Sequence, residues 1–147
     1  MEEYNGEYLL MDRLLKFISV KMAWNKRELT LNDVKYAIEK SVTEQAEQYG
    51  NNTHFADTKV QSDEWHLGRI IYFINHPEEI KDIVIDNLVN GNSIFTMYIC
   101  PIPIIDDGNH RFMAAAYLGL EKVHCRYGGR EDLQLYLKGE TDVCPFE

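Results

Sequence analysis

The chain has 147 residues, of which 45% are hydrophobic and 27% charged, a composition that can bury a core and argues against disorder. Its 15 basic and 24 acidic residues give a net charge of −9, whose field repels nucleic acid, so DNA binding is disfavoured. No apolar run approaches the ~20 residues that span a bilayer, and acidic residues stand where a signal peptide carries basic ones. We therefore expect a cytoplasmic protein with no membrane partner.

The first third of the sequence has patterns typical of helices. Apolar residues recur at helical spacing from Tyr8 to about Trp24, which predicts one amphipathic helix. Thr30, followed three positions later by Asp33, is typical of a helix cap with an acidic residue in the first turn. The apolar pattern after this cap predicts a second helix that continues toward Gln48.

A polar stretch separates this third from the remainder of the chain. Gly50 suits the end of the second helix, and residues 51–61 are polar and predict a loop. We therefore expect a helical N-terminal extension over residues 1–60 and a separate domain over residues 61–147.

The second region begins with a helix and continues with strands. Ser62 suits the cap of a helix that is expected to end at His76-Pro77. The segment Ile80–Asn87 has a spacing that suits either a helix turn or a strand, and its length and β-branched residues favour a strand. Residues 93–105 predict one or two strands that are interrupted at two prolines.

The last third alternates between helix and strand. Arg111–Leu118 predicts a helix that ends at Gly119, Lys122–Tyr127 predicts a short strand, and Glu131–Leu137 predicts a final helix. The order of helices first and a mixed unit afterwards predicts the α+β fold class.

The segment Ile104–Leu120, IIDDGNHRFMAAAYLGL, predicts a strand, a tight loop and a helix start that together bind a phosphate or a similar anion. Gly108 lets the backbone approach a ligand closely, and the helix begins at once. The unpaired N–H groups and the dipole of a helix start attract anions. His110 and Arg111 add side-chain donors, and a guanidinium can grip two phosphate oxygens at once.

A plain turn explains the same residues. Asp-Gly is a common turn pair, and Asn109 suits a helix cap without any ligand. His110 and Arg111 could equally face solvent. The spacing alone therefore leaves a binding site and a simple turn evenly matched.

The run DGNHRFMAAAYLG, from Asp107 to Gly119, resembles the conserved box of the ParB/sulfiredoxin superfamily, and most closely that of the small stand-alone proteins labelled ParB-like nucleases. In that superfamily a strand precedes the loop, and an alanine-rich helix ending in glycine follows it. The resemblance extends loosely over residues 62–128 and includes the helix that carries His66 and Arg69. It implies a ParB/sulfiredoxin-like small mixed sheet with flanking helices, here preceded by the helical extension.

The resemblance also implies a nucleotide-phosphate pocket, because this loop holds the phosphates of ATP or CTP in the superfamily, usually with Mg²⁺. By position, it makes Gly108, Asn109, His110 and Arg111 phosphate-contacting residues. Asp107 is a carboxylate that could hold Mg²⁺ or accept a proton from an attacking group, although support of the turn explains it equally well.

His66 and Arg69 lie three positions apart and therefore share one helix face. They could reach a bound ligand, or they could form the polar side of an amphipathic helix. The resemblance includes both residues, and this favours the pocket.

Two departures from the superfamily limit what carries over. Sulfiredoxins place a reactive cysteine directly before the His-Arg pair, but this position is Asn109, so sulfiredoxin activity is not expected. Chromosome-partitioning ParB proteins continue into a helix-turn-helix and a dimer domain, for which the sequence leaves no room. Classical partitioning is therefore not expected either.

Three hypotheses follow, in this order. The first is an NTP hydrolase or phosphotransferase, in which His110 and Arg111 stabilise the transferring phosphoryl group of a nucleotide or phosphorylated small molecule, and Asp107 holds metal or acts as base. The second is a non-catalytic accessory or inhibitory protein of a phage or mobile element, which binds a protein partner. The third is a metal-dependent nuclease, against which the net charge of −9 counts.

Overall fold

The chain folds into two compact units in a computed structural model, which describes residues 6–24, 27–46, 63–90 and 97–146. Each unit is built from segments that are distant in the sequence. We call the first the sheet unit and the second the helical unit. The sheet unit comprises Met1–Ser19, Lys81–Asn109 and Leu120–Glu147, and the helical unit comprises Val20–Ile80 and His110–Gly119.

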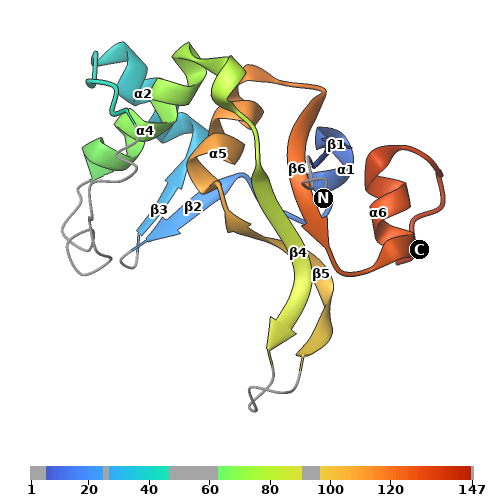
Figure 1. Cartoon of the computed structure of the whole chain (residues 1–147). Coiled ribbons are helices and arrows are strands. Elements are labelled where there is room, and N and C mark those ends of the chain that lie inside the picture. The colour runs from blue at the N-terminus through green and yellow to red at the C-terminus, as the bar shows by residue number, and fades with distance from the viewer. Residues whose placement is uncertain (1–5, 25–26, 47–62, 91–96, 147) are drawn as a thin grey trace, which may run out of the picture. The chain divides into compact units, whose positions relative to one another are not determined.

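The sheet unit contains a mixed four-stranded sheet with the strand order β1-β6-β4-β5 (Figure 1). β6 pairs with β1 in antiparallel and with β4 in parallel orientation, and β4 pairs with β5 in antiparallel orientation. Two helices, α1 and α6, flank this sheet within the unit, so the predicted α+β class is confirmed. The elements are β1 (Glu7–Leu10), α1 (Met11–Leu14), β4 (Ile83–Asn90), β5 (Met97–Asp107), β6 (Lys122–Gly128) and α6 (Glu131–Lys138).

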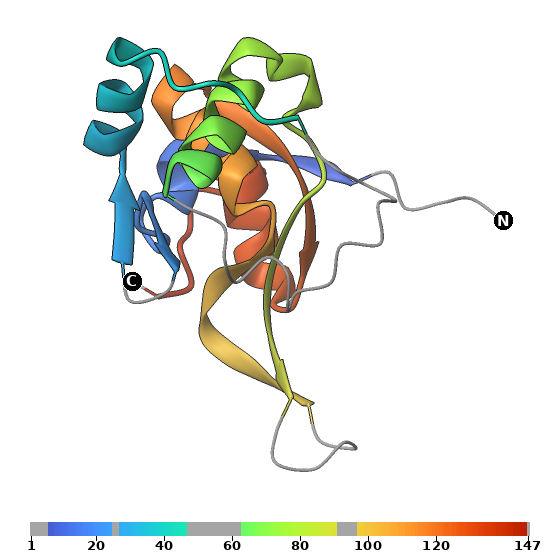
Figure 2. The ribbon, with the colours of Figure 1, turned by 90° about the vertical axis from the view of Figure 1, so that its left-hand side faces the viewer.

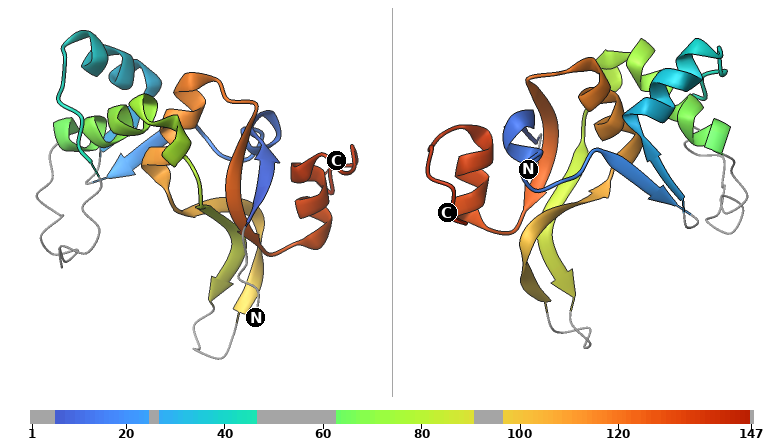
Figure 3. Two further views of the ribbon diagram at one scale, coloured as in Figure 1. Left: turned by 45° about the horizontal axis from the view of Figure 1, so that its top comes forward. Right: turned by 180° about the vertical axis from the view of Figure 1, so that it is seen from behind.

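The helical unit combines a two-stranded antiparallel sheet with helices α2, α4 and α5 (Figures 2 and 3). Helices α4 and α5 lie side by side in this unit. The elements are β2 (Lys21–Trp24), β3 (Arg27–Thr30), α2 (Leu31–Glu39), α4 (Asp63–Asn75), the 3-10 turn η1 (Pro77–Glu79) and α5 (Asn109–Leu118). The buried apolar residues of the unit include Val34, Ala37, Ile70, Phe73, Phe112, Met113 and Ala115.

The helix predicted over residues 8–24 is wrong, and the expected extension is therefore only partly helical. This segment forms strand β1, the single turn of α1 and strand β2. Pairing with β6 accounts for the first strand, because Glu7 lies opposite Cys125 and Leu10 opposite Lys122. Only Leu9 of β1 is fully buried. Long-range pairing has thus overridden a local apolar pattern that also fits a helix.

The helix boundaries that fall on described residues largely match their predicted signals. The backbone N–H of Asp33 donates to Thr30 Oγ1, and the N–H of Thr30 donates to the Asp33 carboxylate at 2.8 Å, which is a capping box. Helix α2 ends earlier than predicted, at Glu39, whereas α4 ends at Asn75 as predicted. The predicted end at Gln48, the Gly50 cap, the loop over 51–61, the Ser62 cap and the domain boundary after residue 60 lie outside the described residues.

The predicted interruption of the strand at Pro101 and Pro103 is wrong, because β5 continues through both prolines. Strand β5 stands at an edge of the sheet, where proline is tolerated. The register also shifts here, since Asp86 pairs with Ile104 but Leu88 pairs with Ile99. The prolines therefore fall in an irregular stretch that lacks regular ladder pairing. The prediction of a strand over Ile80–Asn87 is confirmed, and the observed strand is β4, which runs from Ile83 to Asn90.

The irregular stretch of β4 is held by a buried polar contact in the sheet unit. The hydroxyl of Tyr127 donates to the side-chain oxygen of Asn87, and Asn87 is fully buried. Gly129 passes close by, and a Cβ at this position would lie 2.8 Å from the Cβ of Asn87. Glycine is thus required at position 129 for this close approach.

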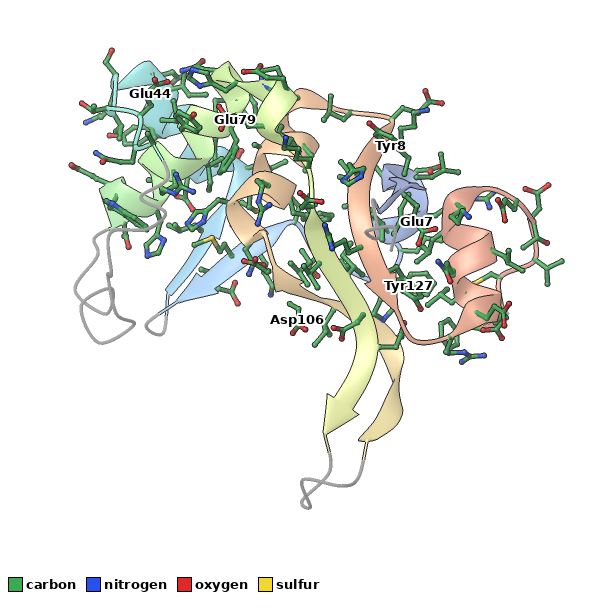
Figure 4. The ribbon with its side chains drawn as sticks, viewed as in Figure 1. Glu7, Tyr8, Glu44, Glu79, Asp106 and Tyr127 are labelled. Carbon is green, nitrogen blue, oxygen red and sulfur yellow. The ribbon has the colours of Figure 1, made fainter. Side chains whose placement is uncertain are left out.

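Two segments from opposite ends of the sequence are tied together by Arg13 of α1. Its guanidinium donates to the backbone oxygens of Tyr136 and Thr141 at 2.6 and 2.7 Å, and to the carboxylate of Asp142 at 2.7 Å. The guanidinium carbon also lies 4.4 Å from the centre of the Tyr136 ring. Glu7 on β1 reaches α6 as well, through the ammonium of Lys138 (Figure 4).

Among the described residues, no helix combines the length and the apolar character that crossing a bilayer requires.

We expect Arg13→Lys to lower the free energy of unfolding by about 2 kcal/mol, because one ammonium cannot replace a planar fork that satisfies two carbonyls. Urea unfolding followed by circular dichroism measures this change. Arg130→Lys is the matched control, since Arg130 pairs with Asp132 at the surface and such pairs contribute little. Equal losses in the two variants would contradict the assigned role of Arg13.

Candidate functional site

The predicted strand, tight loop and helix start are present around Gly108. Strand β5 ends at Asp107, and helix α5 begins at Asn109. Gly108 has φ +97°, in the left-handed region that glycine adopts without strain. The chain therefore passes from strand to helix within one residue, and the first N–H groups of α5 follow directly.

The side chains of this loop differ in exposure. Asp106, which Figure 4 labels, Asp107 and Asn109 are exposed, whereas the Arg111 side chain is only 9% exposed. The chain also passes from the sheet unit to the helical unit between Asn109 and His110. Of the predicted phosphate-contacting residues, Asn109 at the start of α5 is thus exposed to solvent, whereas Arg111 in the first turn of α5 is buried.

The structure brings two predicted residues, His66 of α4 and His110 of α5, into direct contact. His66 Nδ1 lies 3.0 Å from His110 Nε2, and the two rings are nearly parallel at 9° with centres 5.2 Å apart. Trp65 meets both rings edge-on, with centres 5.0 and 5.9 Å away. The two imidazoles therefore form one hydrogen-bonded pair.

Both rings of this pair are neutral at neutral pH. Burial lowers the pKa of His66, with a further lowering by Arg69 and an opposing effect of Asp63. Burial, together with His66, Arg69 and Arg111, lowers the pKa of His110 to about 3. His110 can therefore supply a hydrogen bond near the start of α5 but not the positive charge of an imidazolium.

Arg69, the other predicted residue of α4, is 4% exposed and is held by its own surroundings. Its guanidinium donates to the backbone oxygen of Gln45 at 2.9 Å. The guanidinium carbon lies 5.0 Å from the centre of the Phe73 ring and 5.9 Å from that of Trp65. This geometry gives Arg69 a structural role. It also places the positive charge of the Arg69 guanidinium near the imidazole pair.

Gly68 permits this arrangement, and nothing in the sequence analysis singled it out. The backbone N–H of Gln45 donates to the carbonyl of Gly68 at 3.0 Å. A Cβ on Gly68 would lie 2.4 Å from the backbone oxygen of Thr43, which is closer than atoms can approach. The signal available in the sequence was a glycine in the interior of a predicted helix, where glycine usually has a packing or functional reason.

A second polar cluster, also missed by sequence, lies in the sheet unit. Asp82, at the unusual φ of +56°, donates its N–H to His124 Nδ1 at 3.0 Å. Its carboxylate lies 3.3 Å from the guanidinium of Arg126. These contacts hold the turn before β4.

No three His, Cys, Asp or Glu residues within the described part of the chain converge on a point that could hold a metal ion. Mg²⁺ prefers a few carboxylate oxygens together with substrate phosphates and water. A magnesium site at the exposed Asp107 would therefore need oxygens from a bound ligand, and it stays a prediction.

Comparison of the chain with models of protein families, with curated proteins and with solved structures finds no match. The resemblance of residues 107–119 to the ParB/sulfiredoxin box consequently stays a prediction.

The half-buried imidazole pair predicts how stability depends on pH. A histidine with a lowered pKa in the folded state binds its proton mainly on unfolding, so stability is fully present above pH ~6.5 and falls as the pH drops toward the folded pKa. Each such ring gives a slope of up to about 1.4 kcal/mol per pH unit. We expect His110→Gln to flatten the unfolding free energy between about pH 6 and pH 4, as measured by urea titration at each pH.

His76→Gln is the control for this experiment. A hydrogen bond to the backbone oxygen of Tyr72 raises the pKa of His76, so its contribution is present at low pH and is lost as the pH rises. Its replacement should leave the acid side of the profile no flatter. An unchanged acid side in His110→Gln would show that the pair is not neutral in the folded protein.

Proposed function

We propose that the chain binds a nucleotide or another phosphorylated small molecule at the start of α5, and that it hydrolyses or transfers a phosphoryl group with Mg²⁺. The observation that carries this proposal is the one-residue turn at Gly108, followed by a helix whose first turn holds the buried Arg111. Helix starts of this kind present N–H groups and partial positive charge to an anion.

The buried guanidinium groups support an anionic ligand. Arg111 and Arg69 are both less than a tenth exposed, and both keep their charge at every ordinary pH. Burial lowers the pKa of His110 most, and both guanidinium groups lower it further. Two buried arginines in a chain that carries −9 overall support an anionic ligand at this turn.

Phosphoryl transfer requires mainly positioning and charge stabilisation, and the proposed site assigns these tasks to few groups. Arg111 and the N–H groups of α5 would hold the phosphate oxygens, with ATP or CTP as the first ligands to examine. His110 contributes a neutral hydrogen-bonding ring. Asp107 is exposed and would hold Mg²⁺ with the phosphates or accept a proton from the attacking group.

Arg111→Ala is expected to weaken nucleotide binding at least tenfold, because a charge-assisted contact to phosphate contributes about 1.5–3 kcal/mol. Calorimetric titration with ATP, CTP, GTP and UTP, each with Mg²⁺, measures the affinity. Arg126→Ala is the matched control, because Arg126 is exposed and lies in the sheet unit beside Asp82. Thermal unfolding verifies that both variants fold.

The same samples separate the hypotheses. Release of phosphate from a bound nucleotide supports the enzyme, whereas tight binding without turnover supports a non-catalytic binding protein. Failure of all four nucleotides to bind would contradict a nucleotide as the ligand of this site. Cleavage of added DNA with Mg²⁺ would favour a nuclease instead.

A further inference from the structure

Three side chains that the proposed function does not use close the C-terminal end of α4. Tyr72 lies in the last turn of this helix, His76 follows the helix, and η1 begins at Pro77. His76 Nδ1 lies 2.8 Å from the backbone oxygen of Tyr72, and the hydroxyl of Tyr72 donates to the carboxylate of Glu79 at 2.5 Å. We call Tyr72, His76 and Glu79 the α4 latch.

The α4 latch joins the helix to η1 through both side chains and backbone. The rings of Tyr72 and His76 are stacked, with centres 4.2 Å apart and an angle of 22° between their planes. The backbone N–H of Glu79 donates to the carbonyl of His76 at 2.9 Å. Contacts of both kinds therefore hold η1 against the end of α4.

The contact of His76 with a carbonyl fixes one proton of its ring. A carbonyl oxygen only accepts, so Nδ1 carries a proton in the neutral as well as in the charged ring. Hydrogen bonds from a charged donor are roughly twice as strong as neutral ones. The α4 latch therefore stays formed when His76 is neutral, but it is stronger when His76 is charged.

The surroundings of the His76 ring favour its charged form. The carbonyl oxygens at the end of a helix carry partial negative charge, which stabilises a cation there. The face of the Tyr72 ring is stacked on the imidazole, and an aromatic face attracts a cation. The ring also experiences the carboxylates of Glu44, Glu78 and Glu79. Figure 4 labels the first and the last of these carboxylates, which come from different segments of the helical unit.

The direction of the titration agrees with this geometry. The hydrogen bond to Tyr72 raises the pKa of His76 most, and the three carboxylates raise it further against the opposing effect of burial. A histidine with a raised pKa contributes fully below pH ~6.5, and its contribution is lost as the pH rises through the folded pKa. The hydrogen bond to Glu79 raises the pKa of Tyr72, so the hydroxyl of Tyr72 stays a donor over this range.

We propose that the α4 latch is a pH-sensitive device that holds η1 more tightly against the end of α4 when His76 is charged. The proton comes from solvent and returns to it, and no other bond is made or broken. The device requires no ligand at the start of α5, so it is independent of the proposed function.

Amide hydrogen exchange of the wild-type chain, measured by NMR at a series of pH values, tests the proposal. The readout is the protection factor, which divides out the ordinary effect of pH on the intrinsic exchange rate. The amide of Glu79 is the reporter, because it donates to the carbonyl of His76 across the α4 latch. We expect its protection to fall about two- to fivefold as the pH rises from about 5.5 to about 8.

Nitrogen NMR of the imidazole rings gives the titration midpoint of His76 in the same samples, and we expect it above the ordinary ~6.5. Glu79→Gln keeps an acceptor for the Tyr72 hydroxyl but removes the charge, so the midpoint should move toward the ordinary value. Glu39→Gln is the matched control, because Glu39 is an exposed acidic residue at the end of α2 that does not act on His76.

His76→Gln keeps a side chain that can donate to the Tyr72 carbonyl but cannot become charged, so its protection should not depend on pH. Persistent pH dependence in this variant overturns the assignment to His76. Constant protection in the wild-type chain, or a His76 midpoint at or below ~6.5, overturns the proposal. Equal midpoints in Glu79→Gln and Glu39→Gln overturn the role of Glu79 in the α4 latch.

Discussion

The neutral hydrogen-bonded pair of His66 and His110 determines what the rest of the helical unit can do. Burying two guanidinium groups is costly, and a charged histidine in the same unit would raise that cost further. The unit avoids this by keeping both rings neutral and giving Arg69 a backbone carbonyl of Gln45 as its partner. The positive charge near α5 therefore belongs to the arginines, and the imidazoles supply hydrogen bonds.

This arrangement depends on close backbone approaches that only glycine allows. At Gly68 the carbonyl of Thr43 occupies the space of a side chain, so the partner of Arg69 can be reached. At Gly108 the left-handed backbone lets helix α5 follow strand β5 with only this one residue between them. Neither position carries chemistry itself. Each glycine instead fixes the path of the backbone next to polar side chains. A polar network of this kind tolerates little displacement.

Local signals were sufficient wherever short-range chemistry decides the structure. Thr30 and Asp33 predicted the start of α2 because a capping box is complete within four residues, and Gly119 predicted the end of α5. The N-terminal strand could not be predicted this way, because β1 exists only through its pairing with β6. The strand through Pro101 and Pro103 likewise depends on an edge position and a register shift that become visible only in the assembled sheet.

In the candidate site, too, some features follow from local residues and others depend on long-range packing. The strand, the turn and the helix around Gly108 follow from local residue types, and the shared helix face of His66 and Arg69 follows from their spacing. The contact of His66 with His110, and the lowered pKa of His110, depend on how α4 packs against α5, which no sequence pattern states. Sequence reasoning therefore named the residues but could not give the lowered pKa of His110.

The net charge of the whole chain is also a poor guide to the electrostatic surroundings of the first turn of α5. A net charge of −9 governs how the protein is approached from a distance, where solvent and salt screen individual groups. Within the first turn of α5, burial lowers the pKa of His110 most, and Arg69 and Arg111 lower it further, so these two arginines weigh more there than the charge of the whole chain. A small anion that reaches the turn experiences this local field, whereas a long polyanion must also meet the acidic surface. The contrast favours a compact phosphorylated ligand over nucleic acid.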